Sequence, residues 1–312
     1  VSYIRDRRDP TVPFFLWCSF TKPHPPLDPP EPYYSMYRDC DIPSPVHGDW
    51  ATPENAPPAF LRAQQMWSND LIPPEILREA RSAYYGLITQ CDYNMGRVFA
   101  ALQDLDLFGE TLILFASDHG EYLGDHRAGC KVYFHEPSAH VPLVVRPPKS
   151  WDWPEVGTTC DDLVMLSDIA PTLVSAAGGT LPDNCDGQSL MPGSERRARI
   201  VAQGRPDERP EVLCLMEGDW KYLYWPEGEC EQLFDLSSDP YEVKNLAGLS
   251  EHESKRESMR ASLLAELIAR RASCVEGGEL PVCALAEDEV RKLRTQFWAG
   301  YHTENFGIDV RH

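Results

Sequence analysis

A short apolar run followed at once by metal-binding side chains constrains this chain more than any other feature. The run from Leu112 to Phe115 is rich in strand-forming residues and predicts a buried β-strand, and Asp118 and His119 come directly after it. In open α/β sheets, ligands bind beyond the carboxyl ends of the strands. A carboxylate beside an imidazole suits a divalent cation that binds an anionic ester, and Lys131 could neutralise charge on a leaving oxygen. The pattern indicates a chain that works on a sulfate or phosphate ester.

The order of predicted elements in residues 1–205 is that of an α/β domain. Apolar runs predict strands, and steps of three and four between apolar residues predict helices. The predicted elements are a strand at Pro13–Phe20, a helix from Pro74 to Leu105, the strand at Leu112–Phe115, a strand at Val141–Val145 and a helix at Asp168–Ala177. The proline-rich stretch between residues 26 and 74 shows no periodicity and predicts a long ordered loop. We predict a mostly parallel sheet flanked by helices.

Residues 206–312 show a different pattern and predict a smaller α+β subdomain. Short strand-like runs separated by turn residues are typical of an antiparallel meander. These runs are Val212–Met216, Trp220–Trp225 and Glu231–Leu236. A helix is predicted from Glu253 to Ala272, because Met259, Leu263 and Leu267 share one face. The boundary between the two parts is placed near Arg205.

The charge of the chain argues against one class of partner. There are 29 basic and 49 acidic side chains, giving a net charge of −20, whereas nucleic-acid binding depends on Lys and Arg that neutralise phosphates. No run approaches the ~18 consecutive apolar residues of a membrane span. We therefore expect a small-molecule ester as the partner, with no nucleic acid and no membrane, and leave association with further copies of the chain open.

The ten cysteines indicate a reducing environment. None forms a Cys-x-x-Cys pair, and Cys18, Cys91 and Cys214 lie in apolar runs that suit buried thiols. We expect a cytoplasmic protein, although Cys274 and Cys283 could form a bridge in an oxidising compartment. The chain begins without an initiator methionine, so we also expect a fragment, in which any export signal would be missing.

The candidate metal ligands and the lysine each have a plain structural alternative. Asp118 and His119 can share one ion only where the strand breaks into a loop, which Gly120 permits. Alternatively, Asp118 caps a following helix and His119 is incidental. Lys131 either contacts an anion or is a solvated charge in its glycine-bearing loop.

Three further histidines and one further lysine complete the set of candidates. His24 is held between two prolines, which suits a group that donates a hydrogen bond to an anion at low entropic cost; the alternative is an ordinary surface histidine. His126 and His135 flank Lys131 and could act as acid, base or substrate contact. Lys22, close to His24, is a further candidate substrate contact.

Taken together, these segments resemble a known family. Ser117 to Glu121, Leu123 to His126 and Lys131 resemble the second metal-binding segment of sulfatases and of the related phosphonate monoester hydrolases, in the alkaline phosphatase superfamily. The run Lys22-Pro23-His24-Pro25 resembles their histidine loop. Later landmarks of the family are resembled by Asp168–Leu173, Asp186–Leu190, Asp219–Tyr222, Leu233–Leu236, Asp239-Pro240 and Asn245-Leu246. The motifs follow the order of the family over most of the chain.

The resemblance implies roles for the candidate residues. Asp118 and His119 would be ligands of a divalent cation, usually Ca²⁺ in sulfatases and often Mn²⁺ in the phosphonate monoester hydrolases. His24 and Lys131 would be the catalytic contacts to the sulfate or phosphate oxygens, one of them assisting the leaving group. Histidine rather than asparagine at position 119, and the tyrosine-rich run from residue 33 to 38, tilt the resemblance toward the phosphonate hydrolase branch.

One element of the family does not occur in the printed sequence. Members carry a Cys-x-Pro-x-Arg or Ser-x-Pro-x-Arg element, whose first residue becomes formylglycine, and a pair of aspartates for the same metal. No cysteine here is followed by x-Pro-x-Arg, and after Cys40 the proline comes one position late. We therefore expect formylglycine only in missing N-terminal sequence, and an isolated fold that exposes a sheet edge or borrows a partner.

The predicted function is metal-dependent hydrolysis of sulfate esters, with this chain supplying part of the metal and anion site. On its own the chain is expected to be incomplete and inactive. Two alternatives stay open. One is a phosphonate monoester or phosphodiester hydrolase of the same superfamily, and the other is a non-catalytic remnant that binds an anion or a metal.

Overall fold

Helices and strands are mixed along the chain, and the predicted α/β class is confirmed. The computed structural model describes residues 1–66, 72–131, 133–154, 156–204 and 211–284. Its α-helices are α1 (Tyr33–Met36), α2 (Pro58–Met66), α3 (Pro74–Asp104), α4 (Glu136–Ala139), α5 (Ile169–Ala176) and α6 (Glu253–Ala269). Its strands are β1 (Ile113–Ala116), β2 (Leu143–Arg146), β3 (Arg199–Gly204), β4 (Val212–Glu217), β5 (Trp220–Trp225) and β6 (Cys230–Asp235). Single turns of 3₁₀- or π-helix lie at Tyr3–Arg7, Phe108–Glu110, Asp125–Arg127, Leu166–Asp168 and Ser250–His252.

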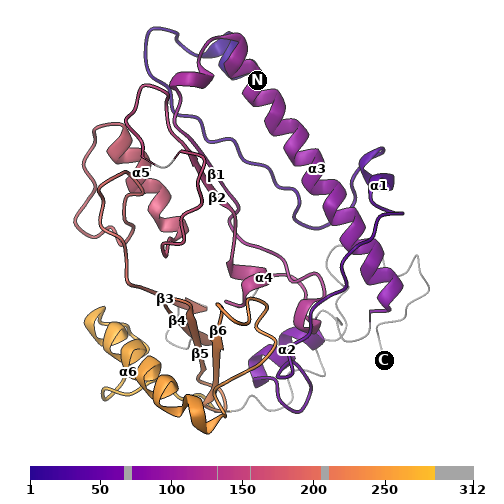
Figure 1. The fold of residues 1–312 in the computed structure, drawn as a ribbon, viewed down its shortest axis with the longest axis vertical. Coiled ribbons are helices and arrows are strands. Elements are labelled where there is room, and N and C mark those ends of the chain that lie inside the picture. Colours follow the sequence, from indigo (N-terminus) through magenta and orange to yellow (C-terminus); the bar gives the residue numbers. More distant parts are fainter. Residues whose placement is uncertain (67–71, 132, 155, 205–210, 285–312) are drawn as a thin grey trace.

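Helix α3 runs along one side of the molecule, beside the small sheet of β1 and β2 (Figure 1). Pro73 and Pro74 start it, since proline is tolerated in the first turn, where backbone N–H groups have no partner inside the helix. Its C-terminal turns bury Ala101 and Leu102 in a cluster against which Ile113 of β1 packs. The predicted helix is confirmed. In the described ranges, no helix is both long and apolar enough to cross a bilayer.

Strands β1 and β2 confirm two predicted strands but pair antiparallel, which corrects the predicted parallel arrangement. The described residues between them form only short helical turns. A parallel return needs a crossover of about a dozen residues or more, usually built on a helix. Phe115 and Val144 lie opposite each other in the register and are 38% and 55% exposed, so an apolar part of this sheet faces solvent. Exposed apolar surface of this kind is typical of an interaction site.

The predicted strand at Pro13–Phe20 is wrong, because this segment is not a strand in the structure. No described strand pairs with it. Its side chains include Phe15 and Trp17, which are 68% and 70% exposed. The composition favoured a buried strand, but an extended segment becomes a strand only where another backbone accepts its hydrogen bonds.

Strands β3 to β6 form an antiparallel sheet in sequential order, with α6 on one face and α2 toward the other (Figure 1). Alternate side chains serve the two faces. Leu213, Leu215, Tyr222, Tyr224 and Leu233 pack with Met259, Leu263 and Leu267 of α6, whereas Val212, Cys214, Leu223, Trp225 and Phe234 pack with Phe60 of α2. Because both faces are covered, β4 and β5 are almost wholly buried.

The antiparallel meander and its helix are thus confirmed, with two additions. Strand β3 was not predicted, and because it pairs with β4 the sheet begins before Arg205. The domain boundary proposed there stays a prediction. Residues 285–312 of the predicted subdomain lie outside the described residues.

Two smaller differences concern the proline-rich stretch and the cysteines. The predicted loop contains the short helices α1 and α2. All ten cysteines are unpaired, including Cys274 and Cys283, so the alternative bridge is not formed. Cys214 is buried as predicted, whereas Cys18 is exposed because its segment is not a buried strand.

Candidate anion and metal site

Segments far apart in the sequence bring the predicted site residues together. Lys131 Nζ lies 2.6 Å from His24 Nε2. The rings of His24 and His119 meet edge to face, with 6.0 Å between their centroids. Asp118 Oδ2 lies 3.8 Å from His119 Nε2. The residues predicted as metal ligands and as anion contacts therefore form one cluster, while their individual roles stay predictions.

The hydrogen bonds of His24 define which of its ring nitrogens carries the proton. Its Nδ1 lies 2.8 Å from the Pro25 carbonyl oxygen, which can only accept, so Nδ1 is the donor. In the neutral ring, Nε2 is then an acceptor and takes one hydrogen from the Lys131 ammonium group. Among the described residues, the other hydrogens of this ammonium group have no acceptor.

The loop that carries His24 is tied to helix α3. Cys91 Sγ lies 3.2 Å from the Lys22 carbonyl oxygen and donates to it. Lys22 Nζ pairs with the Asp28 carboxylate and donates to the Pro26 carbonyl at 2.5 Å, so its charge is used within its own loop. The role of Lys22 as a substrate contact stays a prediction, and this pairing gives it no support.

Asp118 and His119 lie where β1 ends and the backbone enters a loop. Among the described residues, Asp118 caps no helix, and its carboxylate accepts a single hydrogen bond, at 3.2 Å from the His119 backbone N–H; its side chain is 87% exposed. His119 Nδ1 donates to the Gly120 carbonyl at 2.7 Å. Its Nε2 is therefore a bare acceptor in the neutral ring, which is the form that binds a metal.

Gly120 is required because another backbone passes directly over it. A Cβ atom at this position would lie 2.1 Å from the Pro137 carbonyl oxygen. Gly120 N–H donates to the Ser138 carbonyl at 2.7 Å, and Glu121 N–H donates to the Pro137 carbonyl at 2.8 Å. Helix α4 therefore holds the turn that presents Asp118 and His119.

Acidic groups lie behind the cluster and shape its electrostatics. Burial raises the pKa of Glu121, although backbone N–H groups and the nearby Lys131 and His119 oppose this effect. Burial raises the pKa of Tyr84 to about 12, helped by the charges of Glu121, Cys91 and Asp118. Tyr84 thus stays protonated at neutral pH.

The donor atoms of Asp118 and His119 suit a divalent cation, but two side chains alone do not complete its coordination. A carboxylate oxygen and a bare imidazole nitrogen are common metal ligands. Among the residues that the structure describes, no group of three or more His, Cys, Asp or Glu side chains is placed to hold a metal. The role of the pair as metal ligands stays a prediction.

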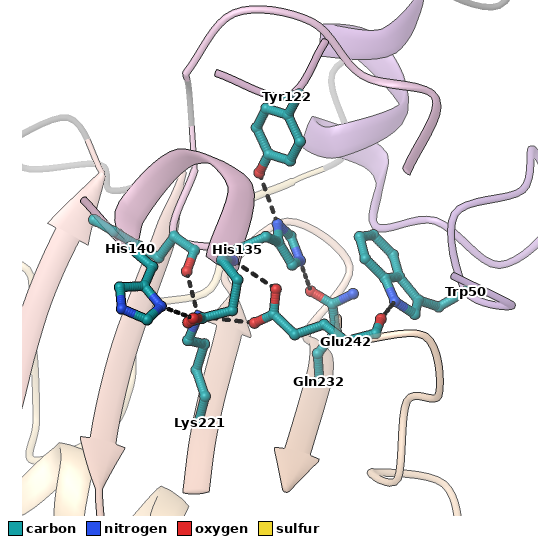
Figure 2. Close-up of polar contacts among 9 residues, drawn as sticks. Trp50, Tyr122, His135, His140, Lys221, Gln232 and Glu242 are labelled. Atoms are coloured by element: carbon teal, nitrogen blue, oxygen red, sulfur yellow. Dashed lines mark hydrogen bonds and ion pairs between the residues drawn. The ribbon is translucent and has the colours of Figure 1, made fainter. Parts of the chain in front are cut away.

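His135 lies in a buried aromatic cluster, away from solvent (Figure 2). Its ring stacks on Trp50 with 4.5 Å between centroids. Its Nδ1 lies 2.9 Å from the Tyr122 hydroxyl and its Nε2 lies 3.2 Å from Gln232 Oε1. Because this oxygen also accepts from the Trp225 indole N–H, it can only accept from His135, so Nε2 carries the proton.

His126 is equally buried and lies beside Trp50, with 4.9 Å between the ring centroids. Its Nδ1 accepts a 3.1 Å hydrogen bond from Gly48 N–H, and its Nε2 has no partner in the described part of the chain. Burial lowers the pKa of His126 to about 4 and lowers that of His135 well below the usual value. Substrate contact by either ring would require this cluster to open, because both are 0% exposed.

Comparison with known proteins gives a consistent result. The family model described as Sulfatase matches residues 1–179. An arylsulfatase of Clostridium perfringens is 35% identical over 285 residues, which cover 90% of this chain and 58% of that protein. The multifunctional alkaline phosphatase superfamily protein PehA of Trinickia caryophylli is 31% identical over 277 residues, covering 76% of this chain and 52% of PehA.

Solved structures agree with the sequence relatives. The phosphonate monoester hydrolase of Agrobacterium radiobacter matches with a TM-score of 0.69 and 27% identity, over 86% of this chain and 59% of that one. The chain thus spans about half the length of the curated relatives it matches. The sequence and structure matches place it in the alkaline phosphatase superfamily. Within that superfamily, the chain belongs to the sulfatase family.

The residues that the sequence analysis missed hold the site from behind. They are Cys91, which anchors the His24 loop, and Pro137 and Ser138, whose carbonyls hold the Gly120 turn. Cys91 gave no distinct signal, because it occupies an ordinary position of the helix. Gly120 did give one, since a glycine directly after two polar site residues indicates a close approach by another backbone.

Proposed function

We propose that this chain forms the part of a sulfatase-family ester hydrolase that binds the oxygens of a sulfate ester and one side of a divalent cation. The observation that carries the proposal is the 2.6 Å contact between Lys131 Nζ and His24 Nε2, beside the ring of His119. The ammonium group of Lys131 and the imidazoles of His24 and His119 lie together, and such a group of side chains suits an anion. The surrounding net charge of −20 makes such local capture necessary.

Lys131 is the residue that we assign to the leaving oxygen. One hydrogen of its ammonium group is held by His24, and no other described residue accepts the remaining ones, which would donate to the ester. A fixed positive charge stabilises the negative charge that develops on the leaving oxygen, and losing one such donor typically costs about 100-fold in rate. His24 orients the ammonium group, since its other nitrogen is fixed on the Pro25 carbonyl.

Asp118 and His119 are the residues that we assign to a divalent cation, Ca²⁺ first and Mn²⁺ as the alternative. When bound, the cation would offset charge on the ester oxygens. His119 would offer Nε2, because Nδ1 is used by the Gly120 carbonyl. Asp118 would offer a carboxylate that is open to solvent.

We also propose that the 312 residues do not complete the reaction alone. No cysteine in them is followed by x-Pro-x-Arg, the element that supplies formylglycine in the family. The protein is therefore expected to hydrolyse 4-nitrophenyl sulfate no faster than buffer alone does. It is still expected to bind Mn²⁺ and inorganic sulfate. Hydrolysis that is lost in Lys131→Met would contradict the incompleteness.

Anion binding tests the site itself. Calorimetric titration with sulfate in the presence of Mn²⁺ should show weaker binding for Lys131→Met than for the unaltered chain. Lys149→Met, in the loop after β2, is the matched control, because it removes one positive charge elsewhere. Equal sulfate binding by the chain and by Lys131→Met would refute the proposed site.

A second candidate function is hydrolysis of phosphonate monoesters. It is favoured by the structural match to the Agrobacterium phosphonate monoester hydrolase and to a similar enzyme from Silicibacter pomeroyi, which has a TM-score of 0.70 and 26% identity over 81% of this chain and 55% of that one. The ratio of kcat/KM for 4-nitrophenyl sulfate and 4-nitrophenyl phenylphosphonate, measured on the product of the complete gene, separates the two. If that product binds metal but turns over neither ester, a non-catalytic role is favoured instead.

A further inference from the structure

A buried ionic cluster joins the C-terminal sheet to the segment that follows Lys131 (Figure 2). Lys221 of β5 is 1% exposed and Glu242 is 0% exposed. Lys221 Nζ lies 2.8 Å from Glu242 Oε1 and 2.5 Å from Glu136 Oε1, and it donates to the Phe134 carbonyl at 2.9 Å. Glu242 Oε2 accepts a 2.6 Å hydrogen bond from Glu136 N–H. One lysine and one glutamate of the C-terminal part thus fix the first residue of α4.

Glu242 is itself fixed from the opposite side. Its carbonyl accepts from the Trp50 indole N–H at 2.7 Å, and its backbone has a left-handed φ of 52°. The neighbouring Val243 carbonyl accepts from Asp49 N–H at 2.8 Å. The carboxylate therefore lies on a clamped loop and has little freedom to follow α4 if α4 moves.

Opposite charges favour the ionised forms of Lys221 and Glu136 despite their burial, whereas burial raises the pKa of Glu242. Burial alone lowers the pKa of Lys221, but the carboxylates of Glu242 and Glu136 outweigh burial and raise it. Burial would raise the pKa of Glu136, but Lys221 and His140 overcome this and lower it. Since an unpaired buried charge is costly, the three side chains hold one arrangement together.

The cluster is connected to His119 through a single peptide group. The Gly120 carbonyl accepts from His119 Nδ1 at 2.7 Å, and the N–H of the same peptide group, on Glu121, donates to the Pro137 carbonyl of α4 at 2.8 Å. Because a peptide group is planar, holding its N–H fixes the direction of its carbonyl oxygen. The place of α4 therefore decides where the acceptor for His119 Nδ1 lies.

We propose that Lys221 and Glu242 are positioning residues for the candidate metal site: through Glu136 and α4 they hold the peptide group that orients the His119 ring. The inference rests on the proposed role of His119 as a metal ligand. It gives the C-terminal sheet a part in the site. A purely structural role of the cluster would instead lower stability without a specific effect on His119.

The test is the tautomer of His119, read from long-range ¹H–¹⁵N correlation spectra of the histidine side chains at a pH where the imidazoles are neutral. The signal of His119 is assigned by its loss in His119→Asn. In the unaltered protein we expect the proton on Nδ1. In Lys221→Met/Glu242→Gln we expect the His119 signals to shift toward a mixture of both tautomers, and the dissociation constant for Mn²⁺ to rise about tenfold or more, as when outer partners of metal ligands are lost.

The matched control is Arg197→Met/Asp168→Asn, which removes another buried ion pair. Its side chains are 10% and 1% exposed, and their other contacts run to Met165 and Gln188 rather than to α4. Glu136→Gln is the milder variant, since this side chain is 17% exposed, and it serves if the double variant does not fold.

Two outcomes decide the inference. A changed His119 tautomer in the cluster variants, with an unchanged one in the control, supports it. An unchanged tautomer in a folded cluster variant, or the same change in the control, overturns it. If the unaltered chain binds neither Ca²⁺ nor Mn²⁺, the proposed function fails, while the tautomer comparison still tests the positioning.

Discussion

Two pairs of histidines differ in how the ring nitrogen Nδ1 is used: it donates a hydrogen bond in the surface pair and accepts one in the buried pair. His24 and His119, at the surface, donate from Nδ1 to the carbonyl of the next residue and leave Nε2 for other partners. His126 and His135, in the buried aromatic cluster, accept at Nδ1. In the surface pair, a turn of the ring's own backbone therefore occupies Nδ1. In the buried pair, distant parts of the chain surround the ring.

The largest difference between the pairs should be in stability. His135→Ala removes a ring stacked on Trp50 and leaves the Tyr122 hydroxyl and Gln232 without this partner, so we expect the free energy of unfolding to fall by about 3 kcal/mol or more. His24→Ala changes an exposed side chain, and its effect should stay within about 0.5 kcal/mol. Urea unfolding of both variants measures this. Equal losses would erase the distinction between the two pairs.

The buried pair should also make stability depend on pH. Burial lowers the pKa of His126 to about 4, so below the ordinary histidine pKa the unfolded chain binds a proton that the folded chain does not. The stability that comes from this difference in proton binding is fully present above the ordinary histidine pKa. It falls as the pH drops from there toward about 4, by about 1.4 kcal/mol per pH unit.

The matched variant is His126→Asn, because asparagine tolerates the left-handed backbone found here, with a φ of 52°. Its unfolding free energy, measured against pH, should lack this part of the slope. Above pH 7 the curves of the two proteins should run parallel, since the imidazole is then neutral in both states. Parallel curves down to pH 4 would mean that the ring is not kept neutral by burial.

Metal binding should depend on His119 of the surface pair together with its neighbour Asp118. Asp118→Asn keeps the size of the side chain but removes the charge of an exposed carboxylate next to His119. We expect the dissociation constant for Mn²⁺ to rise by about tenfold, which is ~1.4 kcal/mol. Electron paramagnetic resonance of free Mn²⁺ during a titration measures it. Asp28→Asn is the control, because it removes one exposed carboxylate charge elsewhere. An equal rise of the Mn²⁺ dissociation constant in that variant would argue against a specific site.

The smallest effect is expected within the His24 loop. Asp28→Asn breaks the ion pair with Lys22, whose side chains are 31% and 63% exposed for Lys22 and Asp28. Exposed pairs contribute between about 0 and 1 kcal/mol, so the midpoint of urea unfolding should hardly change. A large loss of stability would show that this loop depends on the pair more than on its tie to α3.

Strongly patterned elements could be predicted from the sequence, whereas elements that depend on distant partners could not. The periodicity of α3 and α6 and the apolar runs of β1, β2, β4 and β5 are local features. The segment Pro13–Phe20 has the composition of a strand but no paired backbone among the described residues. Strand β3 is the opposite case, because its mixed residues become a strand only through pairing with β4.

The same limit applies to the site. Family resemblance indicated His24, His119 and Lys131, because each is embedded in a local motif, and the structure brings them together. It gave no means of separating His126 and His135 from them. The groups that bury these two rings, Trp50 above all, come from remote parts of the sequence.

The most direct test of the site is a crystal structure of the chain with Mn²⁺ and inorganic sulfate, using the anomalous signal of the metal. We expect the metal on Asp118 and on His119 Nε2, with the sulfate in contact with Lys131 Nζ. A metal bound elsewhere, or a sulfate far from Lys131 and His24, would contradict the account.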